Sequence, residues 1–449
     1  MSERRKILEL FEQQKEFMDE RINSGIEMYR KGYGDIEIKD KDGNPVKNAE
    51  ITISQKTHEF KFGANLFMLD ELETEEKNEK YKKAFSDVFN IATLPFYWDA
   101  TEPEKGHTRY DKNSEKLYRR PAIDLCIEFC EKHGIEPREH ALAYEHFFPD
   151  WLVGASASET KTALEKRYKE IAERYKDKIP TIEVTNEMEW GENDGRTEFY
   201  NQPDYVEWCF KTAEKYFPAN QLVINEWTGL PWGGRCRATD SYYAYIEANM
   251  LKGARIDAIG MQYHMFYHAN DEYKETRPYY DPQKLYNHMN LYSNFGKPLQ
   301  VTEVTIPAYS NDAEDEAIQA EILEKLYSIW FSHPNMEQII YWNLVDGYAY
   351  VADPSMIEKS QGDMTLGENY YYGGLLRFDM TPKPAYNAIK NLIHNKWHTE
   401  AKVMSDGCGK ATFKGFYGKY NIKIKVDGQV IEKEIKLSSK AANKFCIEI

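Results

Sequence analysis

Two glutamates stand at the ends of apolar, strand-like runs. Glu187 closes the segment TIEVTNE (181–187), and Glu303 lies near the end of PLQVTEV (298–304). Both runs have the length and the β-branched content of buried strands. Paired carboxyl groups can split a glycosidic bond, because one protonates the leaving oxygen while the other attacks the sugar. The two residues therefore predict glycoside hydrolysis, if the fold brings the strand ends together.

Polar neighbours of the two glutamates fit the same chemistry. Asn186 precedes Glu187, and its amide can hydrogen-bond a sugar 2-hydroxyl, a contact that strengthens in the transition state. Gln262 and His264 share one face of their strand because they are two residues apart. We expect His264 to hydrogen-bond Glu303 and to hold that carboxylate ionised. An ordinary histidine at the rim of the fold is the alternative for His264.

Further polar and aromatic side chains stand at or just beyond the ends of other apolar runs. They are Tyr97, His140, Glu145, His146, Asn225 and Trp342. A single glutamate at a strand end more often forms a salt bridge or a solvated edge. Two such glutamates surrounded by amides, imidazoles and rings favour a substrate site instead, so we expect these residues to bind substrate.

Eight apolar runs of strand length predict the fold. They are 60–66, 89–96, 139–144, 181–187, 222–227, 258–264, 298–304 and 339–345. Charged segments with helical spacing separate most of them, which is typical of an α/β (β/α)8 TIM barrel. A doubly wound sheet is the alternative, but no glycine-rich phosphate loop follows the first run. A barrel would gather the strand ends, with Glu187 and Glu303, at one mouth.

The two ends of the chain have sequence patterns that differ from that of the predicted barrel. Residues 1–33 form an N-terminal segment, of which 1–31 follow helical spacing up to the glycines at 32 and 34. Residues 34–57 and 399–449 alternate apolar and polar residues, with Asp427-Gly428 as a hairpin turn. Neither set of strands can bury a core alone. We therefore expect one accessory β-sandwich built from both ends, with the barrel, residues 58–398, inserted between them.

Composition excludes several classes of partner. The net charge of −16 argues against nucleic acid and anionic membranes. No run of eighteen apolar residues occurs, so we expect no membrane span. The six cysteines show no metal-binding spacing, and the N-terminus lacks a signal-peptide core. These features predict a cytoplasmic protein without a metal or other cofactor; a secreted protein trimmed of its signal would look the same.

Longer stretches around these residues resemble glycoside hydrolase family 10, the xylanase-like family of the four/seven barrel superfamily. The similar stretches are 98–106, 140–152, 182–187, 222–227, 259–265, 301–304 and 375–389. The resemblance covers residues 60–395 and implies a retaining mechanism on a β-linked oligosaccharide or polysaccharide. It implies that Glu187 is the general acid/base and Glu303 the nucleophile, and that Asn186, Gln262, His264 and Trp342 line the inner subsites.

The chain also departs from the family's pattern. The usual Glu-Asn…Lys set after the second strand falls on Thr93, Leu94 and Tyr97, so the amide and the ammonium are both missing. The usual Trp-His pair after the third strand becomes Tyr144-Glu145, with His146 one place later. These changes alter the glycone subsites. We therefore expect a xylan-type or modified xylan-type glycan, a different β-linked glycan, or a short imported oligosaccharide, and not standard endo-cleavage of plain xylan.

Two other functions compete with hydrolysis by two glutamates. A metal-dependent barrel hydrolase could use His140, His146, His264 and His268, but no His-x-His follows the first strand. A non-catalytic, glycan-binding barrel would keep the cleft without turnover. Both glutamates are present, which favours the enzyme.

Overall fold

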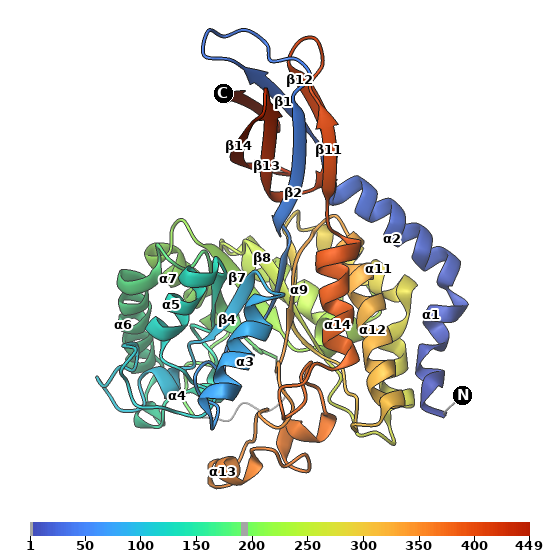
Figure 1. Cartoon of the computed structure of the whole chain (residues 1–449). Coiled ribbons are helices and arrows are strands. Elements are labelled where there is room, and N and C mark those ends of the chain that lie inside the picture. The colour runs from blue at the N-terminus through green and yellow to red at the C-terminus, as the bar shows by residue number, and fades with distance from the viewer. Residues whose placement is uncertain (1–2, 190–195) are drawn as a thin grey trace.

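The structure is a computed structural model that describes residues 3–189 and 196–449. Its main body is a closed barrel of eight parallel strands in the order β10-β3-β4-β5-β6-β7-β8-β9 (Figure 1). The strands are β3 (Lys61–Asn65), β4 (Ile91–Pro95), β5 (Glu136–His140), β6 (Thr181–Asn186), β7 (Gln221–Glu226), β8 (Ala258–His264), β9 (Leu299–Thr305) and β10 (Met336–Tyr341). The predicted TIM barrel is confirmed.

Helices surround the barrel and connect its strands (Figure 1). They are α3 (Glu75–Ser86), α4 (Trp98–Thr101), α5 (Ile123–His133), α6 (Ala157–Tyr175), α7 (Tyr205–Tyr216), α8 (Gly229–Gly233), α9 (Ser241–Leu251), α10 (Glu272–Thr276), α11 (Pro282–Ser293), α12 (Ala313–Ser332), α13 (Ile357–Ser360) and α14 (Pro384–Asn391). Short 3-10 turns lie at Glu145–Phe147, Asp150–Leu152, Arg277–Tyr280, Pro354–Met356 and Gly367–Tyr371, and a π-helical turn at Leu392–Lys396. Local sequence sets their ends: Ser156 and Glu159 form a capping box at the start of α6.

One predicted strand was misplaced. The run 139–144 was expected to be the third barrel strand, but β5 spans Glu136–His140 and the chain has left the sheet by Tyr144. Apart from Pro137, the residues of β5 are polar, and Arg138 and His140 are buried because Glu183 of β6 pairs with both of them. A pattern of apolar residues cannot find a strand whose burial depends on ion pairs. The other predicted runs each overlap an observed strand.

The N-terminal segment is helical but not continuous. It comprises a 3-10 turn (Glu3–Leu8), α1 (Glu9–Gln13) and α2 (Lys15–Tyr29). The two glycines expected to end the helix lie instead in β1 (Lys31–Lys39). A Cβ on Gly32 would meet the Tyr417 ring at 2.6 Å, and one on Gly34 would meet the Phe413 ring at 2.5 Å. Glycine is required there because neighbouring rings occupy the side-chain positions.

Both chain ends build the accessory β-sandwich, as predicted. One sheet has the order β12-β1-β15 and the other β11-β2-β13-β14 (Figure 1). Besides β1, the strands are β2 (Glu50–His58), β11 (Glu400–Met404), β12 (Lys410–Phe416), β13 (Gly418–Val426), β14 (Gln429–Leu437) and β15 (Lys444–Glu448). Asp427 and Gly428 turn β13 into β14 with φ of 49° and 83°, which suits the favoured hairpin turn.

The sandwich has its own small core. Isoleucines from β1 and β2 pack with aromatic and aliphatic residues of β12, β13 and β14. The division at residues 34, 58 and 399 stays a prediction, and the first sheet strand begins slightly earlier, at Lys31. Within residues 3–189 and 196–449, no helix is long and apolar enough to cross a membrane.

Candidate active site

Glu187 and Glu303 reach the same cavity at the carboxyl ends of the barrel strands. Glu303 lies in β9, and Glu187 directly follows β6. The cavity has a volume of about 460 Å³. The predicted residues that line it with the two glutamates are Tyr97, His140, His146, Asn186, Gln262, His264 and Trp342. The fold therefore brings together most of the residues that the sequence nominated.

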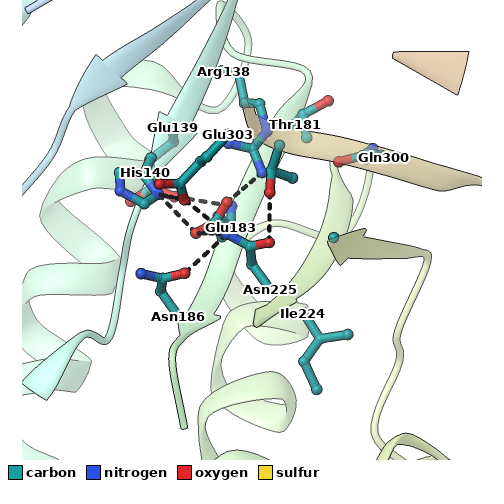
Figure 2. Close-up of polar contacts among 12 residues, drawn as sticks. Arg138, Glu139, His140, Thr181, Glu183, Asn186, Ile224, Asn225, Gln300 and Glu303 are labelled. Atoms are coloured by element: carbon teal, nitrogen blue, oxygen red, sulfur yellow. Dashed lines mark hydrogen bonds and ion pairs between the residues drawn. The ribbon is translucent and has the colours of Figure 1, made fainter. Parts of the chain in front are cut away.

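A cluster of amides ties the two glutamates together. The Asn225 Nδ2 amide group donates to Glu303 Oε1 at 3.0 Å and to Asn186 Oδ1 at 2.9 Å (Figure 2). Gln262 Nε2 donates to the same Asn186 oxygen at 3.2 Å and to Glu187 Oε1 at 2.8 Å. Asn186 thus accepts from two amides, each of which also holds one carboxyl group. Networks with every member satisfied fix side-chain positions.

Asn225 itself corrects a prediction. It was expected to bind substrate, but its side chain is fully buried and does not line the cavity. Thr302 Oγ1 donates to Asn225 Oδ1 at 2.7 Å, which fixes the orientation of the amide. Asn225 is therefore a positioning residue beneath Glu303.

Glu187 is held by its backbone and by two donors. Its φ of 51° is in the left-handed region, which is uncommon outside glycine and concentrates at functional sites. Gln262 donates to one carboxyl oxygen, and the Tyr144 hydroxyl donates to the other. Tyr144 occupies the place of the family's tryptophan, so a phenol hydroxyl stands where the family has an indole N–H. Sequence reasoning missed this contact because Tyr144 was assigned to a strand.

A buried charge cluster lies beside Glu303. Glu183 of β6 pairs with Arg138 and, at 2.7 Å, with His140 Nδ1 (Figure 2). Burial disfavours the ionised form of Glu183, but Arg138 and His140 hold the pKa of this carboxyl group below its ordinary value. Burial likewise opposes the charge of His140, yet the Glu183 carboxylate raises the pKa of that imidazole. His140 Nδ1 lies 4.0 Å from Glu303 Oε1, so this cluster brings positive charge next to Glu303.

Glu303 and His264 meet as predicted, but not with the expected charges. His264 Nε2 lies 3.2 Å from Glu303 Oε2, and its Nδ1 lies 3.0 Å from Thr305 Oγ1. Burial lowers the pKa of His264 to about 4, so the imidazole is neutral at neutral pH. Burial raises the pKa of Glu303 to about 8, against the opposing effect of His140. Of the two imidazoles beside Glu303, His140 therefore has the raised pKa and His264 the lowered one.

Potential metal ligands in the site are already engaged. Within the described part of the chain, His140, Glu183 and Glu303 form the one group whose ligand atoms lie within 4.8 Å of one another. A metal needs a neutral imidazole and free carboxylates, whereas Glu183 pairs with Arg138 and raises the pKa of His140. These residues do not fit a metal ion. His146, His264 and His268, which the metal-dependent alternative needs, are not part of the group.

Comparison with known proteins identifies the family. The sequence model described as Glycosyl hydrolase family 10 matches residues 54–392, which include every barrel strand. The chain belongs to glycosyl hydrolase family 10.

The relatives of this family 10 chain carry more than one name. It is 26% identical over 418 residues to the Anti-sigma-I factor RsgI6 of Acetivibrio thermocellus, an alignment covering 91% of this chain and 47% of that protein. It is 24% identical over 310 residues to Endo-1,4-beta-xylanase 2 of Arabidopsis thaliana, covering 67% of this chain and 25% of that protein. The chain spans about half or less of the length of these curated relatives.

Solved structures share the barrel. Native xylanase 10B from Thermotoga maritima superposes with a TM-score of 0.56 at 22% identity, covering 75% of this chain and 96% of that chain. GH10 from Paenibacillus barcinonensis superposes with a TM-score of 0.55 at 20% identity, covering 75% of this chain and 95% of that chain. At these identities the likeness shows the fold.

The cavity wall shows how this family 10 chain departs from the family's pattern. Thr93 and Leu94 are buried and do not line the cavity, whereas the Tyr97 hydroxyl lies 2.9 Å from His140 Nε2. Glu145, expected to bind substrate, is not among the lining residues, while Tyr144 and Phe147 are.

Two arginines were missed altogether. Arg119 and Arg120 line the cavity from the segment between α4 and α5. This segment has no periodic pattern, and the adjacent pair of arginines in LYRRP was the only available signal.

Proposed function

We propose that this chain is a retaining glycoside hydrolase that cleaves a β-linked glycan of xylan type. The observation that carries the proposal is the amide cluster. Asn225 donates to Glu303, Gln262 donates to Glu187, and both donate to Asn186. One hydrogen-bonded network thus fixes two carboxyl groups at one cavity, which is the arrangement that double displacement needs.

In the proposed first step, Glu303 attacks the anomeric carbon. Protonated Glu187 donates its proton to the leaving glycosidic oxygen, and a covalent glycosyl-enzyme forms. In the second step, Glu187 acts as a base and deprotonates water, which attacks the anomeric carbon and releases the sugar with retained configuration. The carboxyl groups are expected to be about 5–5.5 Å apart, as retention requires.

Glu187 and Glu303 together hold the proton that the first step needs. Because burial raises the pKa of Glu303 to about 8, a proton remains on the two carboxyl groups at neutral pH. We propose that it passes to Glu187 when substrate binds, which leaves Glu303 ionised for attack beside the positive charge of His140. Activity should therefore fall as pH rises through about 8, where the pair loses this proton.

Matched amide variants test the two roles. Glu303→Gln should abolish turnover of every substrate, because the nucleophile is gone. Glu187→Gln should reduce kcat/KM for xylo-oligosaccharides by about 10³-fold or more, since general acid catalysis contributes 10²–10⁴-fold. It should affect the first step far less for aryl glycosides whose leaving groups need no proton. The measurement is kcat/KM on both substrate types for both variants.

Two results would oppose the assignment. Equal losses on both substrate types for Glu187→Gln would remove its role as the acid. Inverted configuration of the first-formed product, read by NMR, would exclude a glycosyl-enzyme on Glu303.

A second candidate function rests on the Anti-sigma-I factor RsgI6. Its alignment covers 91% of this chain and so extends beyond the matched residues 54–392 into the strands of the sandwich. We infer that the barrel and sandwich together could form the glycan-binding part of a regulatory protein, using the same cavity. Calorimetric binding of xylo-oligosaccharides without any hydrolysis would favour this function over the enzyme.

A further inference from the structure

Arg119 and Arg120 bring two guanidinium groups into the wall of the active-site cavity. Arg119 is 3% exposed, and its Nε is buried without a hydrogen-bond partner. Its Nη1 donates to the Tyr348 carbonyl at 2.6 Å. Across residues 3–189 and 196–449, no carboxylate lies within 4 Å of either guanidinium group. Two cations without a carboxylate partner, at the cavity proposed to bind the glycan, favour a ligand with negative charge.

Arg120 is held in place mainly by rings. Its guanidinium carbon lies 4.0 Å from the centroid of the Tyr97 ring and 5.1 Å from that of Phe147. Its Nη1 donates to the Arg119 carbonyl at 3.0 Å. Stacking fixes the guanidinium plane while leaving its edge free to donate hydrogen bonds. A fixed plane with a free edge suits a carboxylate, which accepts two parallel N–H bonds.

This edge lies close to the catalytic centre. Arg120 stacks on Tyr97, the Tyr97 hydroxyl lies 2.9 Å from His140, and His140 lies 4.0 Å from Glu303. Glu187 directly follows β6 and Glu303 lies in β9, so these two strands divide the mouth of the barrel into two sides. Arg120 belongs to the side formed by β10, β3, β4 and β5. A sugar unit beside the cleaved bond on that side would lie within reach of Arg120.

Nearby carboxyl groups do not neutralise the two arginines. Asp99 faces Arg120, but the two are not within 4 Å, and burial raises the pKa of Asp99. Glu368, which also lines the cavity, accepts from Asn343 Nδ2 at 2.8 Å. An arginine keeps its charge in proteins, so Arg119 and Arg120 place two positive charges in the cavity wall of a chain whose overall charge is −16.

We propose that the cavity takes a β-linked glycan that carries a uronic acid, whose carboxylate binds Arg120 with Arg119 beside it. The inference rests on the proposed function and names its substrate more closely. It also explains the missing ammonium at the position of Tyr97: the cation now comes from Arg120, stacked on that ring. A neutral sugar would leave the edge of Arg120 without an anion.

The proposal is tested with matched pairs of substrates that differ only in the charge of one sugar. The substrates are xylo-oligosaccharides that carry one glucuronic acid, as a set of positional isomers, and the same compounds after reduction of the carboxyl group. For at least one isomer, the wild type should show a kcat/KM about 10-fold or more higher on the charged form, as for a charge-assisted hydrogen bond. The ratio should fall with added salt.

Arg120→Gln should bring that ratio to about 1, and Arg120→Lys should leave an intermediate ratio because the charge remains without the fork. Arg21→Gln, which removes an exposed arginine from α2, is the matched control and should keep the wild-type ratio. A wild-type ratio near 1 for every isomer overturns the proposal. An Arg120→Gln variant that loses activity on the charged and the reduced substrates alike, and so keeps the ratio, also overturns it. Such a loss would show only that Arg120 packs on Tyr97.

Failure of the proposed function can be distinguished from failure of the inference about Arg120. If aryl xylosides and all oligosaccharides resist hydrolysis, the hydrolase assignment fails, but calorimetric binding of the charged and reduced glycans still measures the role of Arg120. Stronger binding of the charged form, lost in Arg120→Gln, supports the inference in that case, and equal affinities overturn it.

Discussion

Glu303 is costly to ionise in the folded protein. Burial raises its pKa from 4.5 to about 8, although His140 and Arg138 oppose the shift. A raised carboxyl pKa stabilises the folded state below the unfolded pKa, and this stabilisation is lost as pH rises towards the folded pKa. Ionisation of Glu303 should therefore lower the stability of the fold progressively between about pH 4.5 and about pH 8.

Glu303→Gln should remove this cost. The glutamine oxygen can still accept from Asn225, so the packing is kept. We expect the variant to gain free energy of unfolding over the wild type at pH 8, by up to about 4–5 kcal/mol, because the shift from 4.5 to about 8 spans about 3.5 units and each unit corresponds to about 1.4 kcal/mol. At pH 4 the gain should vanish. Denaturant unfolding of both proteins across this range measures the difference.

Glu20→Gln is the control, since Glu20 is exposed on α2. It should show no gain that grows between pH 4 and pH 8. A Glu303→Gln difference that stays constant with pH would show that the carboxyl group ionises in the fold without penalty.

The meeting of Glu187 and Glu303 at one cavity could be predicted because their positions depend on the strands. Glu187, Glu303, Asn186 and Gln262 lie at the ends of apolar runs, and a barrel gathers such ends by construction. Arg119 and Arg120 could not be predicted, because they lie in a connection with no periodicity. What places Arg120 is a set of rings from separate parts of the chain, which no local pattern encodes.

At the scale of elements, β7 and β8 must approach closely for Asn225 to reach Glu303. Gly260 of β8 allows this: a Cβ there would lie 2.5 Å from Asn225 Oδ1 and 2.9 Å from the Ile224 carbonyl oxygen. Such distances are well below van der Waals contact, so a side chain at this position would push β7 or the amide away. The amide cluster depends on a glycine in the middle of a strand.

Gly260→Ala adds only one methyl group, but it should lower activity markedly. Displacement of Asn225 removes a donor to Glu303, and misplaced catalytic groups cost on the order of 10²-fold in rate. Overpacking should also cost about 1–3 kcal/mol of folding free energy. Steady-state kinetics and denaturant unfolding give the two effects. Gly407→Ala is the control, because a Cβ there meets nothing within 4 Å; an active Gly260→Ala variant would show that β7 and β8 adjust freely.

The pattern of apolar residues in the sequence could not locate the polar strand β5. Its position follows from Arg138 and His140 pairing with Glu183 on the neighbouring strand β6, and that partner is 43 residues away from His140. The sandwich shows the opposite case. Its strands alternate clearly, and the argument that neither end can bury a core alone was enough to join them.

At the scale of the whole molecule, the two chain ends form one folding unit around the barrel. Ile422 of β13 is fully buried and faces Ile53 of β2 in the sheet register. Ile36 and Ile51 from the N-terminal strands pack in the same core. The N-terminal strands thus depend on residues about 370 positions later, so damage at one end should expose the other.

Ile422→Ala tests this dependence. Loss of the buried side chain should cost about 2–4 kcal/mol within the sandwich. Hydrogen exchange should then accelerate together in residues 31–58 and 400–448, while β3 to β10 keep their protection because their core is separate. Val430→Ala, at a position that is 58% exposed on β14, should leave exchange unchanged. Faster exchange confined to residues 400–448 would contradict a shared core, since the strands of the N-terminal end would then hold their structure without it.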